Sequence, residues 1–334
     1  MNQTRKIRWL IAHEPVELFL RTARAFSDKL SELTNNEYEV EIFTAKEYEE
    51  RIKNDKLMTV FDKLSKQNTG LYKVDPMVAM EAGELEMSQL HITELAKWHS
   101  PDFFALEMPF LFRDHDHAAR VLEGTIGQGL LDNLKDTSPA QGLAFTYSGG
   151  FRVVVSKEPL LTLEDFKGIT FATATNPVTV DTVEAVGAVP ESFHIRDFVQ
   201  IANTEGFDSS ALETTIPRYL AQFKDSTKKY LVNTKHNLFL TSIIVSNTFW
   251  ASLDADTQAK FQAASVYASR LERQWSVEEA EEFAVESDKH AELGITYSEL
   301  NTEETEKFKQ LVQPLYDKYK DFFYPGLIDG IIRS

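Results

Sequence analysis

The order of apolar runs and amphipathic segments near the N-terminus most constrains the fold. Residues 7–12 form a short apolar run suited to a buried strand, and residues 16–33 place apolar side chains at helical spacing. Residues 38–43 alternate between apolar and polar side chains, which is typical of a second strand. A charged helical stretch at 46–68 and a helix that closes at Gly83 lead into a third strand. This β-α-β-α-β order predicts an α/β sheet with right-handed crossovers.

The second half of the chain continues in the same style. We expect two strands separated by a turn at Ser148–Gly150, because Ser-Gly-Gly is a turn signal. The longest β-branched run, 237–246, predicts another strand. Residues 254–293 predict one long helix that bridges or buttresses two lobes, and Thr302 predicts a capping-box start for the terminal helix.

Composition limits the class of protein. At 334 residues the chain is long for a single hydrophobic core, so two lobes are expected. The net charge of −17 argues against a nucleic-acid-binding surface and against a basic membrane-surface helix. The sequence has no cysteine, and it has no apolar run of about 18 residues that could span a bilayer. Residues 1–15 lack the features of a signal peptide, so the protein is either cytosolic or has lost its signal.

The sequence contains no motif for bond-making chemistry. GTIGQG at 124–129 lacks the spacing of a dinucleotide-binding loop, and HEPVE at 13–17 lacks the second histidine of a zinc-binding helix. YSGG at 147–150 does not match a nucleophile elbow. We therefore expect no catalytic residue, no metal site and no cofactor. The competing class is an enzyme that uses His13 or His91 as a general base, although the sequence pairs neither residue with an orienting carboxylate.

Polar residues at predicted strand ends indicate a ligand-binding cleft. Small ligands bind at the strand ends of open α/β sheets, and ionisable side chains there are costly to bury without a partner. Such residues occur at His13–Glu14, at Gln89–His91, at Arg152 and in the loop 172–175. Each alone is compatible with a satisfied polar residue in a loop. Together they predict the wall of one cleft.

The segment 101–134, PDFFALEMPFLFRDHDHAARVLEGTIGQGLLDNL, resembles the most recognisable block of the TRAP-transporter solute-binding proteins, the dicarboxylate-type periplasmic receptors. The resemblance continues through SGGFRVVVSKEP, LEDFKG, VGAVP and KHNLFLTSIIVSNTFWASLDADTQAKF, and covers nearly the whole chain in the right order. It implies a two-lobed, periplasmic-binding-protein-like α/β fold with hinge strands and a long helix spanning both lobes, which close over a small ligand. It also implies a periplasmic mature protein whose export signal is missing here.

The lobes can be assigned on this pattern. Residues 1–145 with part of 237–300 form a discontinuous first lobe, and residues 146–236 form the core of the second. Residues 254–334 supply the long bridging helix and the C-terminal helices, which we expect to pack on both lobes.

The resemblance also points to ligand-binding residues. Aligning LEDFKG with the family pattern places Ala172 where the family carries an arginine that grips the ligand's carboxylate through two hydrogen bonds. Arg152 matches a second ligand-contacting position, and Arg196 follows a stretch that often touches ligand. Either arginine could replace the missing one. Alternatively, the ligand is neutral or cationic and contacts Glu14 and His91.

The residues after the LEDFKG motif offer neutral hydrogen-bonding groups. Thr173, Thr175 and Asn176 suit hydroxyl or amide groups of a ligand, although Thr175 or Asn176 could instead cap the next helix. For Arg152, the alternative to a ligand is an ion pair with a protein carboxylate. The complete predicted ligand-binding set is Glu14, Gln89, His91, Arg152, Ala172, Thr173, Thr175, Asn176, His194, Arg196 and Ser209.

We therefore expect a receptor that captures a small polar organic metabolite, either a carboxylate or a zwitterion. The resemblance implies that it delivers this ligand to the membrane subunits of a TRAP-type secondary transporter. The alternative is a sensor receptor that presents its ligand to a signalling partner. We expect a monomer that is not embedded in the membrane and has no nucleic-acid partner.

Overall fold

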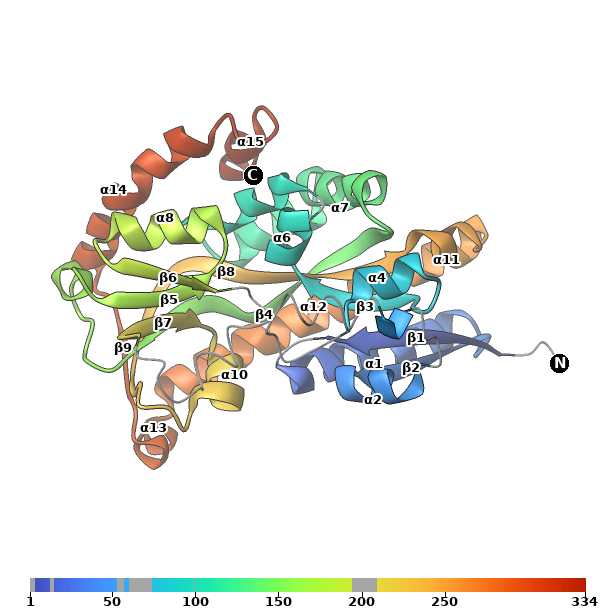
Figure 1. Ribbon diagram of the computed structural model, residues 1–334, viewed down its shortest axis with the longest axis horizontal. Coiled ribbons are helices and arrows are strands. Elements are labelled where there is room, and N and C mark those ends of the chain that lie inside the picture. The colour runs from blue at the N-terminus through green and yellow to red at the C-terminus, as the bar shows by residue number, and fades with distance from the viewer. Residues whose placement is uncertain (1–3, 13–14, 53–56, 60–73, 99, 194–208) are drawn as a thin grey trace. The chain divides into compact units, whose positions relative to one another are not determined.

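The computed structural model describes residues 4–12, 15–52, 57–59, 74–98, 100–193 and 209–334 (Figure 1). The chain divides into two compact units. The first comprises Met1–Ser100, Leu122–Tyr147 and Leu240–Gln274, and the second comprises Pro101–Val121, Ser148–Phe239 and Trp275–Ser334. The segment 101–121 therefore falls in the second unit, whereas the sequence pattern predicts it in the first lobe.

The first unit is built on parallel strands. β1 (Arg5–Ile11) pairs in parallel with β2 (Tyr38–Thr44) and with β3 (Met87–His91). Helix α1 (Val16–Leu33) connects β1 to β2, and β3 pairs antiparallel with β8 (Tyr230–Ser246). The predicted β-α-β-α-β order is confirmed for the described residues, and its three strands pair in parallel. Most of the helical stretch predicted at 46–68 lies outside the described residues.

Aromatic side chains fill the core of this unit. The rings of Trp9 and Phe26 lie 5.1 Å apart, and Phe26 also lies 5.9 Å from Phe261 of α12 (Ala255–Val285). The buried residues of α1 recur every three or four positions, as its apolar spacing predicts. The other helices in the described part of the first unit are α2 (Ala45–Arg51), α4 (Pro76–Glu81), α5 (Ile92–Trp98), α7 (Thr125–Thr137) and α11 (Asn247–Ala251).

The second unit contains a mixed sheet in the order β8-β4-β7-β5-β6, with β9 (Thr296–Glu299) beside β8. β4 (Ala140–Ser156) pairs antiparallel with β7 (Ala211–Thr214). β5 (Thr170–Ala174) pairs in parallel with β7 and with β6 (Val189–Phe193). The helical segments are η1 (Pro101–Glu107), α6 (His115–Glu123), η2 (Leu163–Phe166), α8 (Pro177–Ala185), α10 (Ile216–Arg218), the π-helical turn η3 (Tyr219–Phe223), α13 (Ser287–Leu293), α14 (Thr302–Tyr319) and α15 (Leu327–Arg333).

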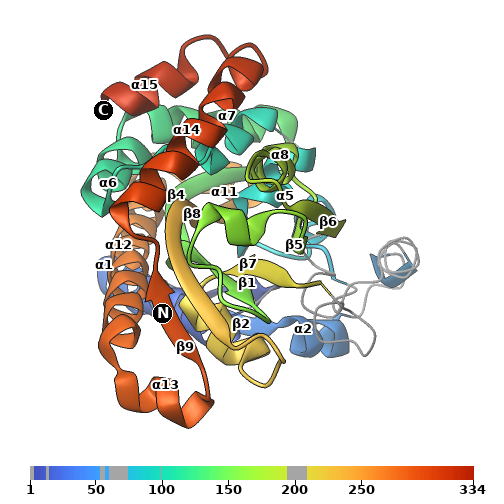
Figure 2. The same cartoon turned by 90° about the vertical axis from the view of Figure 1, so that its left-hand side faces the viewer.

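The two faces of this second sheet differ in character. On one face, Ala172 and Leu212 belong to an apolar cluster with Tyr219. The other face carries Glu213 and is covered by α8 and by α14, which follows β9 in the chain (Figure 2). The hydroxyl of Tyr319 on α14 donates a 2.6 Å hydrogen bond to Asp181 on α8 and so ties the two helices together.

The predicted turn at Ser148–Gly150 is wrong, because β4 runs without a break through these residues. Gly149 and Gly150 adopt φ angles of 96° and 82° inside the strand, which glycine tolerates at little cost. Gly149 also has no room for a side chain, since a Cβ there would lie 2.6 Å from Cδ of Pro217. Gly149 therefore serves a close approach of two chain segments and not a reversal of direction.

The predicted long helix is interrupted near its C-terminal end. α12 stops at Val285 and α13 begins at Ser287, because Glu286 has a ψ of 70°, which is not helical. The carbonyl of Phe283 accepts hydrogen bonds from the Glu286 N–H at 3.2 Å and from the His290 ring at 2.6 Å. In an uninterrupted helix, the Phe283 carbonyl would accept a hydrogen bond from the backbone N–H four residues later. These two bonds satisfy the carbonyl in its place.

The start of the terminal helix also differs by one residue from the prediction. Asn301 caps α14, and its side chain accepts a 2.9 Å hydrogen bond from the Glu304 N–H, whereas the sequence pattern predicts the cap at Thr302. Asparagine is at least as good an N-cap as threonine, so residue type alone does not show whether Asn301 or Thr302 caps the helix. Among the helices of the described ranges, none is both long and apolar enough to cross a membrane.

Candidate functional site

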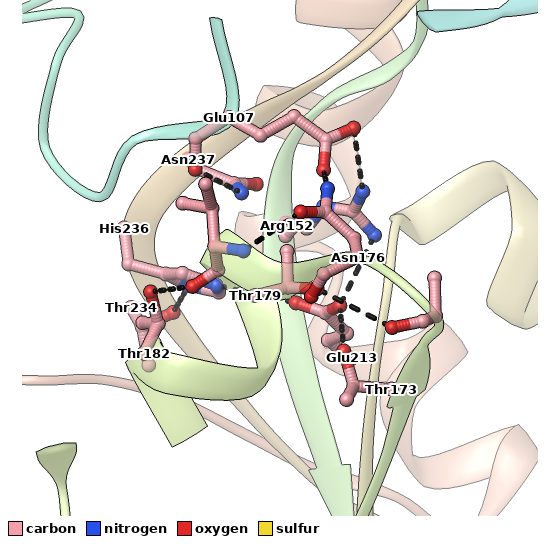
Figure 3. A network of polar contacts seen from close by, with 12 residues as sticks. Glu107, Arg152, Thr173, Asn176, Thr179, Thr182, Glu213, Thr234, His236 and Asn237 are labelled. Carbon is pink, nitrogen blue, oxygen red and sulfur yellow. Dashed lines mark hydrogen bonds and ion pairs between the residues drawn. The ribbon is translucent and has the colours of Figure 1, made fainter. Parts of the chain in front are cut away.

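Arg152 lies at the centre of a polar network in the second unit (Figure 3). The residue is 2% exposed, and its guanidinium carbon lies 4.0 Å from the centre of the Phe239 ring. Its Nη1 is 3.6 Å from Oε1 of Glu213, and its Nη2 is 3.9 Å from Oε1 of Glu107. A buried cation is strongly destabilising unless it is paired, so these two carboxylates allow Arg152 to remain charged in the interior.

Glu213 is positioned by the pairing of β7 with β4. Its partner in the register is Val154, two residues from Arg152, and alternate residues of a strand share a face. Oε1 of Glu213 accepts a 2.6 Å hydrogen bond from Thr173, and Oε2 lies 3.4 Å from Nε2 of His236. Burial alone would raise the pKa of Glu213, but Arg152, His236 and Thr173 outweigh burial and hold this pKa at about 2. Glu213 is therefore a carboxylate at neutral pH.

Glu107 provides the second negative charge from the end of η1. It is 1% exposed, and its Oε2 accepts a hydrogen bond from Nδ2 of Asn176. Asn176 is the N-cap of α8, and its Oδ1 accepts a 2.9 Å hydrogen bond from the Val178 N–H. Because both ends of the Asn176 amide are engaged, the amide fixes the orientation of the Glu107 carboxylate.

A small cavity adjoins this network. Its volume is about 20 Å³, and its polar lining comes from Glu213, His236, Asn237 and two threonines of α8, Thr179 and Thr182. A space of this size can hold one water molecule. The His236 ring stacks on Phe308 at 5.9 Å, and its Nδ1 is 2.6 Å from Oγ1 of Thr234. The imidazole is thus held in one orientation at the edge of the cavity.

One edge of the Arg152 guanidinium is not used for hydrogen bonding. Within the described ranges, Nε and Nη2 have no hydrogen-bond partner, and the carboxylates of Glu213 and Glu107 are beyond hydrogen-bond distance. The N–H groups on Nε and Nη2 point the same way and form a pair that matches the two oxygens of a carboxylate. The arrangement therefore offers a fixed, charged donor pair for one carboxylate or a comparable acceptor.

Two further predicted residues lie beside Arg152, and Ala172 and Thr175 lie elsewhere in the same unit. Thr173 and Asn176 both contact its carboxylate partners, as described above. Ala172 instead packs in the apolar cluster on the opposite face of the sheet. Thr175 is exposed, and its N–H donates a 2.7 Å hydrogen bond to the Phe193 carbonyl. The helix cap that the sequence left open between Thr175 and Asn176 belongs to Asn176.

The remaining predicted residues divide into three groups. Ser209 is buried in the second unit, where its hydroxyl donates to Glu191. Gln89 and His91 are buried on β3 of the first unit, where the Gln89 amide donates to Thr146 at 2.8 Å and to Thr241 at 3.0 Å. Glu14, His194 and Arg196 lie outside the described residues.

Three residues of the network, Glu107, Glu213 and His236, were not predicted from the sequence. Glu107 had a detectable signal, because it is the single charged residue in the apolar run 103–112 and must find a partner if that run is buried. Glu213 had none, since it lies in a short four-residue strand between Leu212 and Thr214. Its role depends on the register of β7 against β4, which the sequence does not specify.

Stability should fall in acid through Glu213. Its pKa in the folded protein is about 2 and its ordinary value is 4.5, so its contribution is fully present above pH 4.5 and is lost as the pH falls towards 2. We expect the free energy of unfolding, measured with urea between pH 7 and pH 2.5, to decrease less steeply in Glu213→Gln than in the unaltered protein. If the free energy of unfolding fell equally with pH in both proteins, Glu213 would not be the cause of the acid dependence.

The mixed α/β fold and a buried arginine with two hydrogen-bond donors unused within the described residues are compatible with a small-molecule-binding class of protein. The family model described as bacterial extracellular solute-binding protein, family 7, matches residues 14–321. The chain therefore belongs to this family, as the sequence resemblance predicted, and the family consists of solute-binding receptors.

Individual relatives agree with this assignment. The C4-dicarboxylate-binding periplasmic protein DctP of Rhodobacter capsulatus is 25% identical, and the match covers 75% of this chain and 74% of that protein. The sialic acid-binding periplasmic protein SiaP of Vibrio cholerae is 25% identical, with 71% of each chain covered. A TRAP periplasmic solute-binding protein of Polaromonas sp. JS666 bound to D-erythronate has a TM-score of 0.79 at 22% identity, with 98% of each chain covered. These similarities confirm the predicted two-lobed α/β fold class.

Proposed function

We propose that this chain is the periplasmic receptor of a TRAP-type transporter and that it binds a small organic acid through Arg152. Arg152 is buried, permanently charged and fixed by two carboxylates, yet its Nε and Nη2 donors are unused within the described ranges. This open edge is the observation that carries the proposal, because it matches the geometry of a carboxylate. Binding and release of the solute, without bond-making chemistry, would be the whole activity of the chain.

The named ligands of the relatives support an acid as the ligand. The proteins from Rhodobacter capsulatus and Vibrio cholerae are described as binding C4-dicarboxylates and sialic acid. The structure from Polaromonas holds D-erythronate, and one from Shewanella oneidensis, with a TM-score of 0.78 at 18% identity over 99% of each chain, holds succinate. These relatives are periplasmic by description, which supports the same location here. The membrane subunits of a TRAP transporter would then receive the ligand.

The ligand can be identified directly from the purified protein. We expect that denaturing the protein releases a small carboxylic acid detectable by mass spectrometry. The same acid, added back to the refolded protein, should raise its melting temperature in a concentration-dependent way, since a ligand that binds only the folded state stabilises it. Release of a compound without any carboxyl group, together with no stabilisation by a panel of organic acids, would contradict the proposal.

A further inference from the structure

A second, larger cavity lies within the second unit, on the face of β4 away from Arg152. Its volume is about 300 Å³, enough for a small organic molecule, and all its lining residues belong to this unit. Val153 lines the cavity and belongs to the apolar cluster that also holds Ala172. Because adjacent residues of a strand point to opposite faces, Arg152 and Val153 serve two separate sites.

The buried part of this lining is apolar and partly aromatic. Val153 and Ile216 are at most 2% exposed, and the half-buried rings of Phe151 and Tyr297 stand beside them in the lining. Ala284, in the last turn of α12, is too small to fill the space next to it. Apolar side chains and aromatic rings favour a ligand that has an apolar body.

The exposed part of the lining carries charged side chains, which we call the rim. Three acids, Asp114, Glu281 and Glu299, stand against two bases, Arg113 and Lys235. Three negative and two positive charges leave the rim with a net charge of −1. A negative rim attracts cations and repels anions.

Glu281 is the rim carboxylate best placed to meet a ligand. Nζ of Lys235 lies 3.4 Å from Oε1 of Glu299, so these two charges offset each other. Asp114 accepts a 2.7 Å hydrogen bond from the His117 N–H in the first turn of α6. Glu281 is exposed, and no residue that the structure describes forms an ion pair or a hydrogen bond with its carboxylate.

His115 adds an aromatic surface to the wall without adding a positive charge at neutral pH. Its ring lies 4.9 Å from the ring of Phe151, and both residues line the cavity. Burial lowers the pKa of His115 below its ordinary value of 6.5, although Glu281 acts in the opposite direction. A cation can therefore approach aromatic rings here, which attract it through their π electrons, without meeting an imidazolium.

We propose that this cavity is a second ligand site and that it takes a small organic cation, an amine or quaternary ammonium on an apolar or aromatic body. The body would lie against Phe151 and Ala284, and the cationic nitrogen would face Glu281 at the rim. The inference is independent of the acid-binding function proposed above, because Arg152 is not part of this lining.

The test uses three probes that share a phenylethyl body and differ in charge: 2-phenylethylamine, its N-trimethyl form and 2-phenylethanol. Each is titrated at neutral pH into the full ¹⁵N-labelled chain, and NMR gives both the affinity and the place of binding. We expect the better cation to bind at least about fivefold more tightly than the alcohol, from a cation–π contact and an exposed ion pair. The amide signals of Phe151, Ala284 and Tyr297 should shift.

Two variants separate the charge of the site from its space. Glu281→Gln should weaken the cations by about two- to fivefold and spare the alcohol, since it removes one exposed ion pair. Ala284→Phe fills the cavity and should abolish binding of all three probes. Glu282→Gln, exposed on α12 and outside the lining, is the matched control and should keep the unaltered affinities. If Ala284→Phe does not fold, the shifted signals of the unaltered chain still locate the site.

Four results would each overturn the inference. These are equal affinity for the cations and the alcohol, signal shifts that avoid the cavity, cation binding that survives in a folded Ala284→Phe variant, and a preference for cations that is undiminished in Glu281→Gln. None of them bears on the proposed function, which fails only if organic acids neither bind nor stabilise the protein.

Discussion

Replacing Arg152 with alanine is expected to abolish ligand binding and to lower the free energy of unfolding by about 3–5 kcal/mol, the cost of breaking a buried ion pair. The change leaves Glu107 and Glu213 buried, both at no more than 4% exposure, without the cation that pairs with them. Urea unfolding and calorimetric titration with the released ligand would measure the two effects. Arg24→Ala, on the exposed face of α1, is the matched control and should change neither quantity by more than about 0.5 kcal/mol.

Arg152→Lys separates binding from stability. Lysine keeps the charge that Glu107 and Glu213 require but lacks the pair of parallel donors. We expect the fold to remain intact and binding to weaken by about 1.5–3 kcal/mol, the range for a hydrogen bond to a charged group. Equal affinity of the unaltered protein, Arg152→Lys and Arg152→Ala would remove Arg152 from the binding site.

Gly149→Ala should be the other severely damaging substitution. A Cβ at this position would lie 2.6 Å from Cδ of Pro217 and 2.7 Å from Oγ1 of Thr215, which donates a hydrogen bond to the Ser148 carbonyl. The φ of 96° is also unfavourable for any residue with a side chain. We expect a loss of about 2–5 kcal/mol in the free energy of unfolding, as the sum of a left-handed backbone and overpacking.

Gly168→Ala isolates the backbone part of this effect. Gly168 has a similar φ of 74°, but no atom lies within 4 Å of the position that its Cβ would take. We therefore expect Gly168→Ala to cost about 1–2 kcal/mol and Gly149→Ala to cost more. Because Arg152 follows Gly149 on β4, only Gly149→Ala should also weaken ligand binding. Equal losses from the two substitutions would mean that the contacts with Pro217 and Thr215 relax freely.

The regular elements of the fold were largely predictable from the sequence, because hydrophobic periodicity reports directly on burial. The spacing of apolar residues predicted α1 with its observed bounds, and alternation predicted β2. The predictions were wrong where the same local sequence pattern is compatible with two different structures. Ser148–Gly150 has the composition of a turn, yet the glycines there allow β4 to pass close to Pro217. Whether Ser148–Gly150 forms a turn or a close approach depends on the segment around Thr215, 67 residues later in the chain.

The candidate site was predictable only in part, for a related reason. Arg152 could be singled out from the sequence because it lies at a predicted strand end and matches a family position, and a charged residue there needs a partner. Its contact with a ligand remains a prediction. The identity of its protein partners could not be predicted, since Glu107, Glu213 and Phe239 come from segments far apart in the chain. Ala172 shows the limit of alignment by motif, because its side chain lies on the apolar face while Thr173 lies on the face of Arg152's partners.

The placement of Glu107 on η1 separates the charge beside Arg152 from the hydrogen bonds of the sheet. Arg152 and Glu213 belong to strands whose backbone hydrogen bonds hold the sheet together, whereas Glu107 ends a short 3₁₀ helix outside that sheet. A substitution at Glu107 can therefore alter the charge beside Arg152 and leave the strand pairing unchanged. A single codon change can thus reset the electrostatics around Arg152 without any remodelling of the scaffold.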